Sequence, residues 1–171
     1  MGLFTGREVP DPKPRSRTLM DAVRDDDHAL VSETLARGER VTQTNAYGRT
    51  PLHKACYYSG APAVIAELIR AGADVNAVDK GNWTCAHLAA RNHHNDALKA
   101  LLECEGGANL AVADVKHGWT AAHSAVIAGN AVGARMLRRA GAAFETRDKS
   151  GASVFDLLRE NGIRLDEEER A

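Results

Sequence analysis

Apolar residues recur along the chain in short segments with the spacing of one helix face. The clearest segments are Val64, Ile65, Leu68 and Ile69; Leu98, Leu101 and Leu102; and Val132, Met136 and Leu137. The first segment follows the i, i+1, i+4, i+5 spacing that places apolar side chains on one buried face of a helix. Gly72 and Gly141 follow the first and third segments, where glycine readily takes the left-handed conformation that ends a helix. The pattern predicts a series of short amphipathic helices of similar design.

A hexapeptide beginning with Thr precedes each of these segments. Its copies are TPLHKA at 50–55, TCAHLA at 84–89 and TAAHSA at 120–125. In the first copy Thr50 is a good helix N-cap, and Pro51 stands at the first helical position, where its missing N–H costs nothing. We expect a helix from there to about Tyr58, with Gly60 breaking the turn before the next helix. The chain is thus predicted to be built from helix pairs.

These helix pairs repeat with a nearly constant period. Aligned on the first residue of the hexapeptide, the intervals are 34, 36 and 33 residues from Thr50 to Thr84, Thr120 and Ser153, the last copy being degenerate. Counting back 33 residues from Thr50 leads to Arg17, which puts Leu19 and Ala22 on apolar positions. The expected units lie near 17–44, 45–78, 79–113, 114–147 and 148–165. Atypical end units are expected because terminal repeats have no outer neighbour.

The hexapeptide and the period together carry a resemblance to a known family. Residues 50–55 match the ankyrin signature T-P-L-H-x-A letter for letter, and the period is the ankyrin period. The chain resembles the ankyrin-repeat family over about residues 17–165. The resemblance implies an all-α fold, an ankyrin-repeat solenoid of stacked helix pairs with β-hairpin-like fingers. The 36-residue interval predicts either a longer second helix or a bulged loop near Glu105, and an enlarged finger at Lys116 and His117.

Two segments fall outside the expected stack. Residues 1–16 contain Pro10, Pro12 and Pro14 in alternation with charged residues, which predicts an extended N-terminal arm without its own core. Residues 166–171 are predicted to form an acidic C-terminal tail.

Composition narrows the class of protein. The 171 residues carry 22 basic and 23 acidic side chains, so the net charge gives no global support for nucleic-acid binding. No apolar run approaches the roughly 18 residues that a membrane-spanning helix needs. Three cysteines at unrelated positions argue against a disulfide framework and favour a reducing compartment. We therefore expect an intracellular, cytoplasmic protein.

Histidine is the residue type that most invites a catalytic or metal-binding interpretation. His53, His87 and His123 occupy the fourth position of the hexapeptide, three residues after Thr50, Thr84 and Thr120. An imidazole near a helix start can bond the Thr hydroxyl and the finger backbone, so these six residues are interpreted as the structural repeat motif. Successive repeats place such histidines about 8–10 Å apart, too far to share one metal ion.

Other candidate chemistry is weaker still. His93 and His94 fall in a turn without a Cys or carboxylate at ligand spacing, Asp25–Asp27 suits a helix terminus, and no cysteine pairs with a nearby base. We predict no catalytic residue, no cofactor and no metal.

The resemblance implies instead a protein partner, of unknown identity, bound by finger tips and by exposed positions of the first helices, which line a concave face. The predicted finger-tip residues are Tyr47, Arg49, Lys80, Asn82, Trp83, Lys116, His117, Trp119, Lys149 and Ser150. The predicted helix residues are Lys54, Tyr57, Tyr58, Leu88, Arg91, Asn92, Ser124 and Ile127.

Two questions stay open at this level. Trp83 and Trp119 precede the Thr in successive repeats, and either they bind a partner or they pack against neighbouring fingers and stiffen the stack. The chain is interpreted as a non-enzymatic protein-binding module, an adaptor or scaffold, or alternatively as a structural subunit of a larger assembly docked by its N-terminal arm. It also resembles small ankyrin-type kinase inhibitors in size and repeat number, a likeness that any five-repeat array shares.

Overall fold

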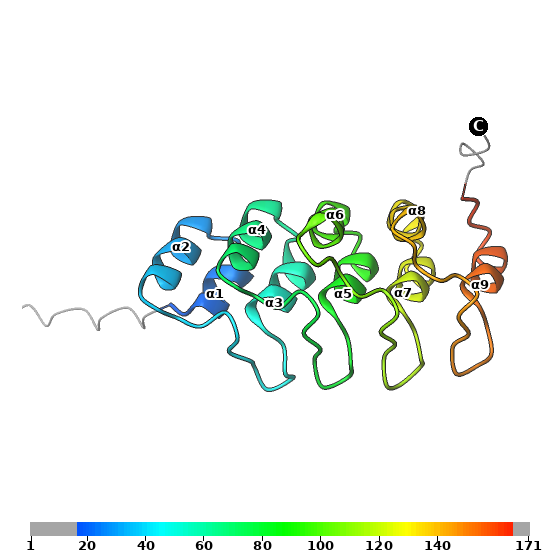
Figure 1. Cartoon of the computed structure of the whole chain (residues 1–171), viewed down its shortest axis with the longest axis horizontal. Helices are drawn as coiled ribbons and strands as arrows, with labels where there is room; N and C mark the ends of the chain where they lie inside the picture. Colours follow the sequence, from blue (N-terminus) through cyan, green and yellow to red (C-terminus); the bar gives the residue numbers. More distant parts are fainter. Residues whose placement is uncertain (1–16, 166–171) are drawn as a thin grey trace, which may run out of the picture.

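The computed structural model describes residues 17–165, which form nine helices and no strand within that range. The predicted arm at 1–16 and tail at 166–171 lie outside the described residues. Figure 1 shows two parallel rows of helices, with loops projecting on one side like fingers. The all-α solenoid of stacked helix pairs is confirmed.

The inner row, next to the fingers, alternates along the chain with the outer row. The inner helices are α1 (Leu19–Arg24), α3 (Pro51–Tyr58), α5 (Cys85–Arg91), α7 (Ala121–Ile127) and α9 (Val154–Glu160). The outer helices are α2 (His28–Ala36), α4 (Pro62–Arg70), α6 (Asn95–Glu103) and α8 (Ala131–Arg139). None of these described helices is long and apolar enough to cross a membrane.

Every inner helix begins with a capping box. In the three central units the Thr hydroxyl lies 2.8–2.9 Å from the Nδ1 atom of the histidine three residues later. That nitrogen also receives the backbone N–H of the Thr, so two groups at the helix start are satisfied together. The end units use an aspartate instead, in the pairs Thr18–Asp21 and Ser153–Asp156. The first helix is therefore capped by Thr18, one residue after the position reached by counting back.

The core lies between the two rows. Its largest apolar side chains are at most 2 % exposed and belong to Leu19, Leu52, Ile65, Leu68, Leu88, Leu98, Leu101 and Leu137. Burying one such side chain contributes about 1.5–3 kcal/mol. Because the main contacts between helices join only the same or adjoining units, stability is passed from neighbour to neighbour along the stack.

The structure resolves where the long repeat holds its extra residues. Helix α6 has 9 residues, as do α2, α4 and α8, so the second helix is not longer. The chain instead leaves α6 at Cys104 in an extended conformation, and Gly106 and Gly107 then take positive φ angles of 82° and 54°. Of the two sequence expectations near Glu105, the bulged loop is the one observed.

The last unit has a single helix among the described residues. After α9 the chain turns at Asn161 and Gly162, and Ile163 and Leu165 pack partly against the core. In Figure 1 this segment rises beside α8, on the side where another outer helix would stand. Residues 17–165 therefore contain five inner helices and four outer helices.

Candidate partner-binding surface

Each finger is folded around the side chain of one Asn or Asp. Asn45, Asp79, Asp114 and Asp148 stand at the finger bases, and each accepts backbone N–H groups from residues two to five positions later. Asp114, for example, accepts N–H bonds of 3.1 Å from Lys116 and 2.7 Å from Trp119. These four residues were not among those predicted from the sequence, although they recur about every 34 residues.

The backbone bond that closes each finger shows which finger is enlarged. Asn45, Asp79 and Asp148 each donate N–H to the carbonyl four residues later, whereas Asp114 donates to Trp119, five residues later. The extra residue predicted at Lys116 and His117 is therefore present in the third finger.

Hydrogen bonds at the bases of the third and fourth fingers lower the pKa values of Asp114 and Asp148. Burial alone would raise the pKa of Asp114, but the N–H groups of Trp119, His117 and Lys116 outweigh it and hold the pKa below its usual range. For Asp148, burial is likewise outweighed by bonds from Ser150, Ala152 and Trp119, and the pKa is lowered.

Backbone hydrogen bonds join adjacent fingers. The N–H of Lys80 donates to the carbonyl of Tyr47 (3.0 Å), Val115 donates to Gly81 (2.9 Å), and Lys149 donates to His117 (2.8 Å). One such bond per junction holds the finger tips in a fixed register along the array.

The repeat histidines are buried, and each makes contacts within the protein. His53 and His87 are buried, and their Nε2 atoms lie 3.1 and 2.9 Å from the carbonyl oxygens of Trp83 and Trp119 in the following unit. His123 is equally buried, but its Nε2 has no hydrogen-bond partner within residues 17–165. Burial lowers the pKa of all three imidazoles, more than the neighbouring carbonyls and carboxylates raise it.

Both tryptophans are half-buried and make contacts within the protein. The indole of Trp83 packs against the core, with the guanidinium of Arg91 5.4 Å from its ring centre. The indole N–H of Trp119 donates to Asp148 of the next finger at 3.1 Å, and the ring stacks on His117 at 3.9 Å. These contacts support the stiffening interpretation without removing either ring from the surface.

Among Phe, Trp and Tyr residues within 17–165, the three tyrosines are the most exposed. Tyr47, on the first finger, is 70 % exposed, and Tyr57 and Tyr58, on α3, are 41 % and 51 % exposed. The guanidinium of Arg49 lies 5.1 Å from the centre of the Tyr57 ring, and it also pairs with Asp79 at 3.0 Å. Lys54 lies 5.8 Å from the Tyr58 ring and donates to the carbonyl of Met20. Cations thus hold these rings in place while leaving them accessible.

The remaining predicted residues divide by exposure. Lys80, Arg91, Lys116, Lys149 and Ser150 are exposed; Asn82, Asn92, His117 and Ile127 are partly buried. Asn82 uses its amide to bond the carbonyl of Ala113 at 2.8 Å. Leu88 and Ser124 are only 2 % and 1 % exposed, so their expected place on the binding surface is wrong. Each is turned into the packing between neighbouring inner helices.

The other histidines and the cysteines also have structural surroundings. His93 and His94 reach in opposite directions, to the carbonyls of Ala128 and Cys56, each at 2.9 Å. Cys56 and Cys85 are buried free thiols, and burial raises the pKa of Cys85 well above its usual value. Among residues 17–165 no three His, Cys, Asp or Glu side chains are grouped so that they could hold a metal ion.

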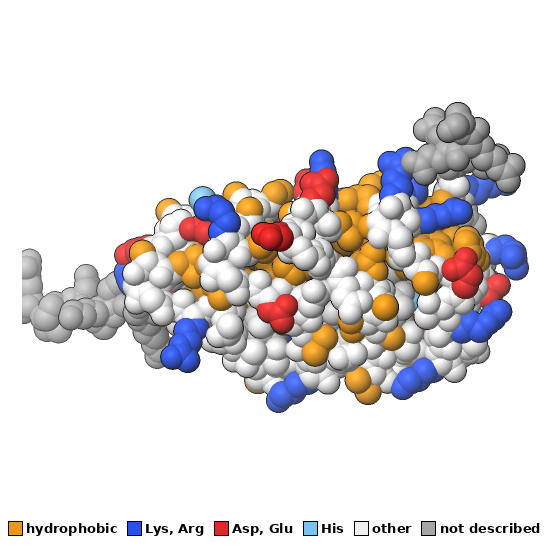
Figure 2. All heavy atoms as spheres, viewed as in Figure 1, with side chains coloured by type: hydrophobic (Ala, Val, Ile, Leu, Met, Phe, Trp, Pro, Cys, Tyr) orange, Lys and Arg blue, Asp and Glu red, His pale blue; other side chains and the backbone are white. Residues whose placement is uncertain are grey.

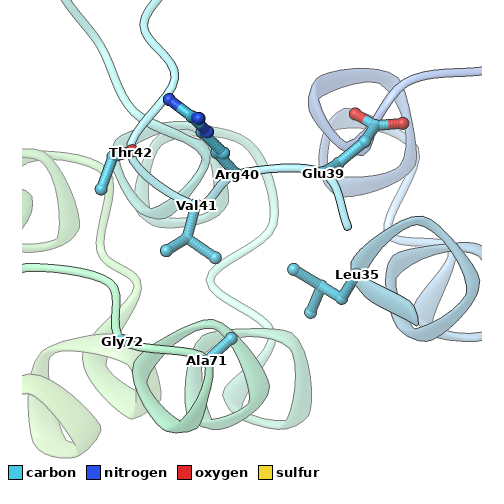
Figure 3. A pocket seen from close by; sticks show the side chains of 7 residues that line it. All are labelled: Leu35, Glu39, Arg40, Val41, Thr42, Ala71 and Gly72. Carbon is cyan, nitrogen blue, oxygen red and sulfur yellow. The ribbon is translucent and has the colours of Figure 1, made fainter. Parts of the chain in front are cut away.

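One shallow pocket lies between the ends of α2 and α4. It has a volume of about 380 Å³ and is lined by Leu35, Glu39, Arg40, Val41, Thr42, Ala71 and Gly72. Figure 3 shows Leu35 and Val41 pointing into it, whereas Arg40 and Glu39 point away. Glu39 is already used to accept the N–H of Leu19 at 2.9 Å. Because no set of polar groups converges on this pocket, the fingers and inner helices remain the better candidate site.

Comparison with known protein families agrees with the repeat geometry. A family model described as Ankyrin repeats (3 copies) matches residues 19–114 and 57–148.

Three curated relatives illustrate the range of proteins that contain similar segments. Glycerophosphocholine phosphodiesterase gde1 of Schizosaccharomyces pombe is 32% identical over 129 residues, covering 75% of this chain and 11% of the relative. B-cell lymphoma 3 protein of Homo sapiens is 33% identical over 136 residues, covering 78% and 30%. A putative ankyrin repeat protein of Rickettsia bellii is 35% identical over 86 residues, covering 50% and 48%. The chain thus spans less than half of each of these relatives.

Proposed function

The chain belongs to the ankyrin-repeat family, and from that premise we propose that it is a non-enzymatic module that binds a protein partner through its inner surface, meaning the fingers and the exposed positions of α3, α5 and α7. Ankyrin repeats generally mediate protein–protein interactions. The role proposed is that of an adaptor or scaffold, in the cytoplasm, where the three free cysteines would remain reduced.

The observation that carries this proposal is the exposure of Tyr47, Tyr57 and Tyr58 on one surface. Tyrosine is enriched among the residues that dominate binding energy at protein interfaces, because a large rigid ring is buried there at small entropic cost. Tyr57 and Tyr58 contact one another edge to face, with ring centres 4.9 Å apart, and Arg49 and Lys54 lie over them. The cluster is therefore ordered before any partner arrives, which reduces the cost of binding.

The proposal is tested by affinity capture with three forms of the full chain: wild type, Tyr57→Ala with Tyr58→Ala, and Val132→Ser. Val132 is 46 % exposed on the outer helix α8 and serves as the control. We expect the tyrosine variant to remain folded by circular dichroism and to lose a partner that both other forms retain, which mass spectrometry would identify. Equal capture of every partner by all three forms would contradict the proposal.

A further inference from the structure

On the inner surface, the carboxylates of the second and third fingers are buried, whereas the lysines are exposed. In the stretches 45–58, 79–92 and 114–127, which form three fingers and helices α3, α5 and α7, Asp79 and Asp114 are the only acidic residues. Both are buried, at 9 % and 3 % exposure, and their oxygens accept bonds from their own fingers. Asp79 also holds Arg49 of the preceding finger. These negative charges are therefore committed within the protein.

The finger lysines are exposed: Lys80 and Lys116 in the second and third fingers, and Lys149 in the fourth. Lys80 and Lys116 form no ion pair with a carboxylate among residues 17–165, and Lys149 directs its ammonium to the carbonyl of Val115. On the outer helices, by contrast, Arg37 and Lys99 each pair with a glutamate four residues earlier or later in the chain. Figure 2 shows basic side chains along the lower edge, where Figure 1 places the fingers, and acidic ones mostly above it. The finger tips are thus locally basic although the whole chain has a net charge of −1.

Apolar groups accompany these lysines. Val115, at the base of the third finger, is 63 % exposed, and Tyr47, on the first finger, is 70 % exposed. A partner that fits this surface needs carboxylates together with apolar side chains, which favours a protein segment over a nucleic acid.

From this arrangement we propose that the row of finger tips bearing Lys80, Lys116 and Lys149 binds an extended acidic protein segment with carboxylates about every third residue. The spacing follows from geometry, because neighbouring helices pack about 8–10 Å apart. A segment in the polyproline II conformation has three residues per turn and advances about 3.1 Å per residue, so every third side chain lies on the same side, about 9 Å from the next. The backbone bonds between fingers hold Lys80 and Lys149 at equivalent positions, directly after Asp79 and Asp148. Lys116 stands one residue further along the enlarged third finger, where Val115 makes the corresponding backbone bond. This inference rests on the proposed function and adds to it the chemistry of the partner.

The test is selection from a displayed library of random peptides about twelve residues long, against the immobilised full chain, with a thymidine oligonucleotide tested in parallel. Selected peptides are then synthesised and their affinity is measured by fluorescence anisotropy. One variant carries Lys80→Glu and Lys116→Glu. The control carries Arg70→Glu and Lys99→Glu, exposed residues of α4 and α6 that give the same change in net charge.

We expect the selected peptides to be enriched in Asp and Glu at intervals of three. Their affinity should fall at least about tenfold in the finger variant and at high salt, and change little in the control. Selected peptides without acidic enrichment, equal losses in both charge variants, or tighter binding of the oligonucleotide would overturn the inference. If neutral peptides are selected and lose affinity for the Tyr57→Ala, Tyr58→Ala variant, the proposed function stands while this inference fails. Peptides that bind every variant equally would contradict both.

Discussion

Mild acidification should destabilise the protein because of the three buried repeat histidines. In the unfolded chain each imidazole has a pKa near 6.5, whereas burial lowers the pKa of His53, His87 and His123 in the folded protein. As the pH falls, the unfolded state therefore binds more protons than the folded state. The free energy of unfolding has its full value above the unfolded pKa of 6.5 and decreases as the pH falls below it. The nearby carboxylates of Asp79, Asp114 and Asp148 oppose this shift but do not cancel it.

The size of the effect follows from proton linkage. Between about pH 7.5 and 5.5, a histidine that stays neutral in the folded state costs at most about 1.4 kcal/mol, and three cost about 4 kcal/mol. That is a large part of the roughly 5–15 kcal/mol by which domains are stable. The aspartates with lowered pKa, such as Asp114, contribute stability that is lost only as the pH falls below their unfolded value of 3.8, so this range isolates the histidines.

The assay is guanidinium unfolding followed by far-ultraviolet circular dichroism at several pH values in that range. His87→Gln should lower the stability at neutral pH but reduce its pH dependence by about one third, because one of three linked protons is removed. Val132→Ser, which changes an exposed residue and no titratable group, should leave the dependence unaltered. A free energy of unfolding that stays constant on acidification, or an unchanged dependence in His87→Gln, would refute the reasoning.

Two pairs of substitutions test individual contacts by thermal or guanidinium unfolding. Trp119→Phe removes the hydrogen bond to Asp148 and should lower the free energy of unfolding by about 1 kcal/mol. Trp83→Phe removes no hydrogen bond found in the described chain and should lower it less. Equal losses of stability in the two variants would show that the bond to Asp148 contributes nothing. Gly60→Ala should destabilise strongly, because its φ is +65° and an added Cβ would lie 2.5 Å from the Cβ of His94. Gly72→Ala, at φ +88° with nothing within 4 Å, should cost only the roughly 1–2 kcal/mol of the left-handed conformation; similar costs at both sites would mean that His94 can move aside.

The sequence predicted the stack well because its signals are local. Thr50, Pro51 and Gly72 announce a helix start or stop by their own backbone chemistry, and apolar spacing marks the buried faces. The surface was harder to predict, because exposure depends on the neighbouring unit. Leu88 looks like any position after the repeat histidine, yet the adjoining inner helices cover it. Trp119 could be placed on a finger, but its bond to Asp148 depends on how closely the next finger approaches.

Within residues 17–165, the two ends of the stack differ in how well their last helix is covered, and local unfolding is expected to start at the less covered end. At the C-terminal end of the described residues, α9 has no outer helix paired with it, whereas each of the four preceding inner helices is followed by one. Within residues 17–165, helix α9 is therefore expected to unfold locally first, followed by α7 and α8. A ligand that binds the third and fourth fingers together would stabilise α9 against this local unfolding. Helix α9 and the rest of the stack would then unfold as one cooperative unit.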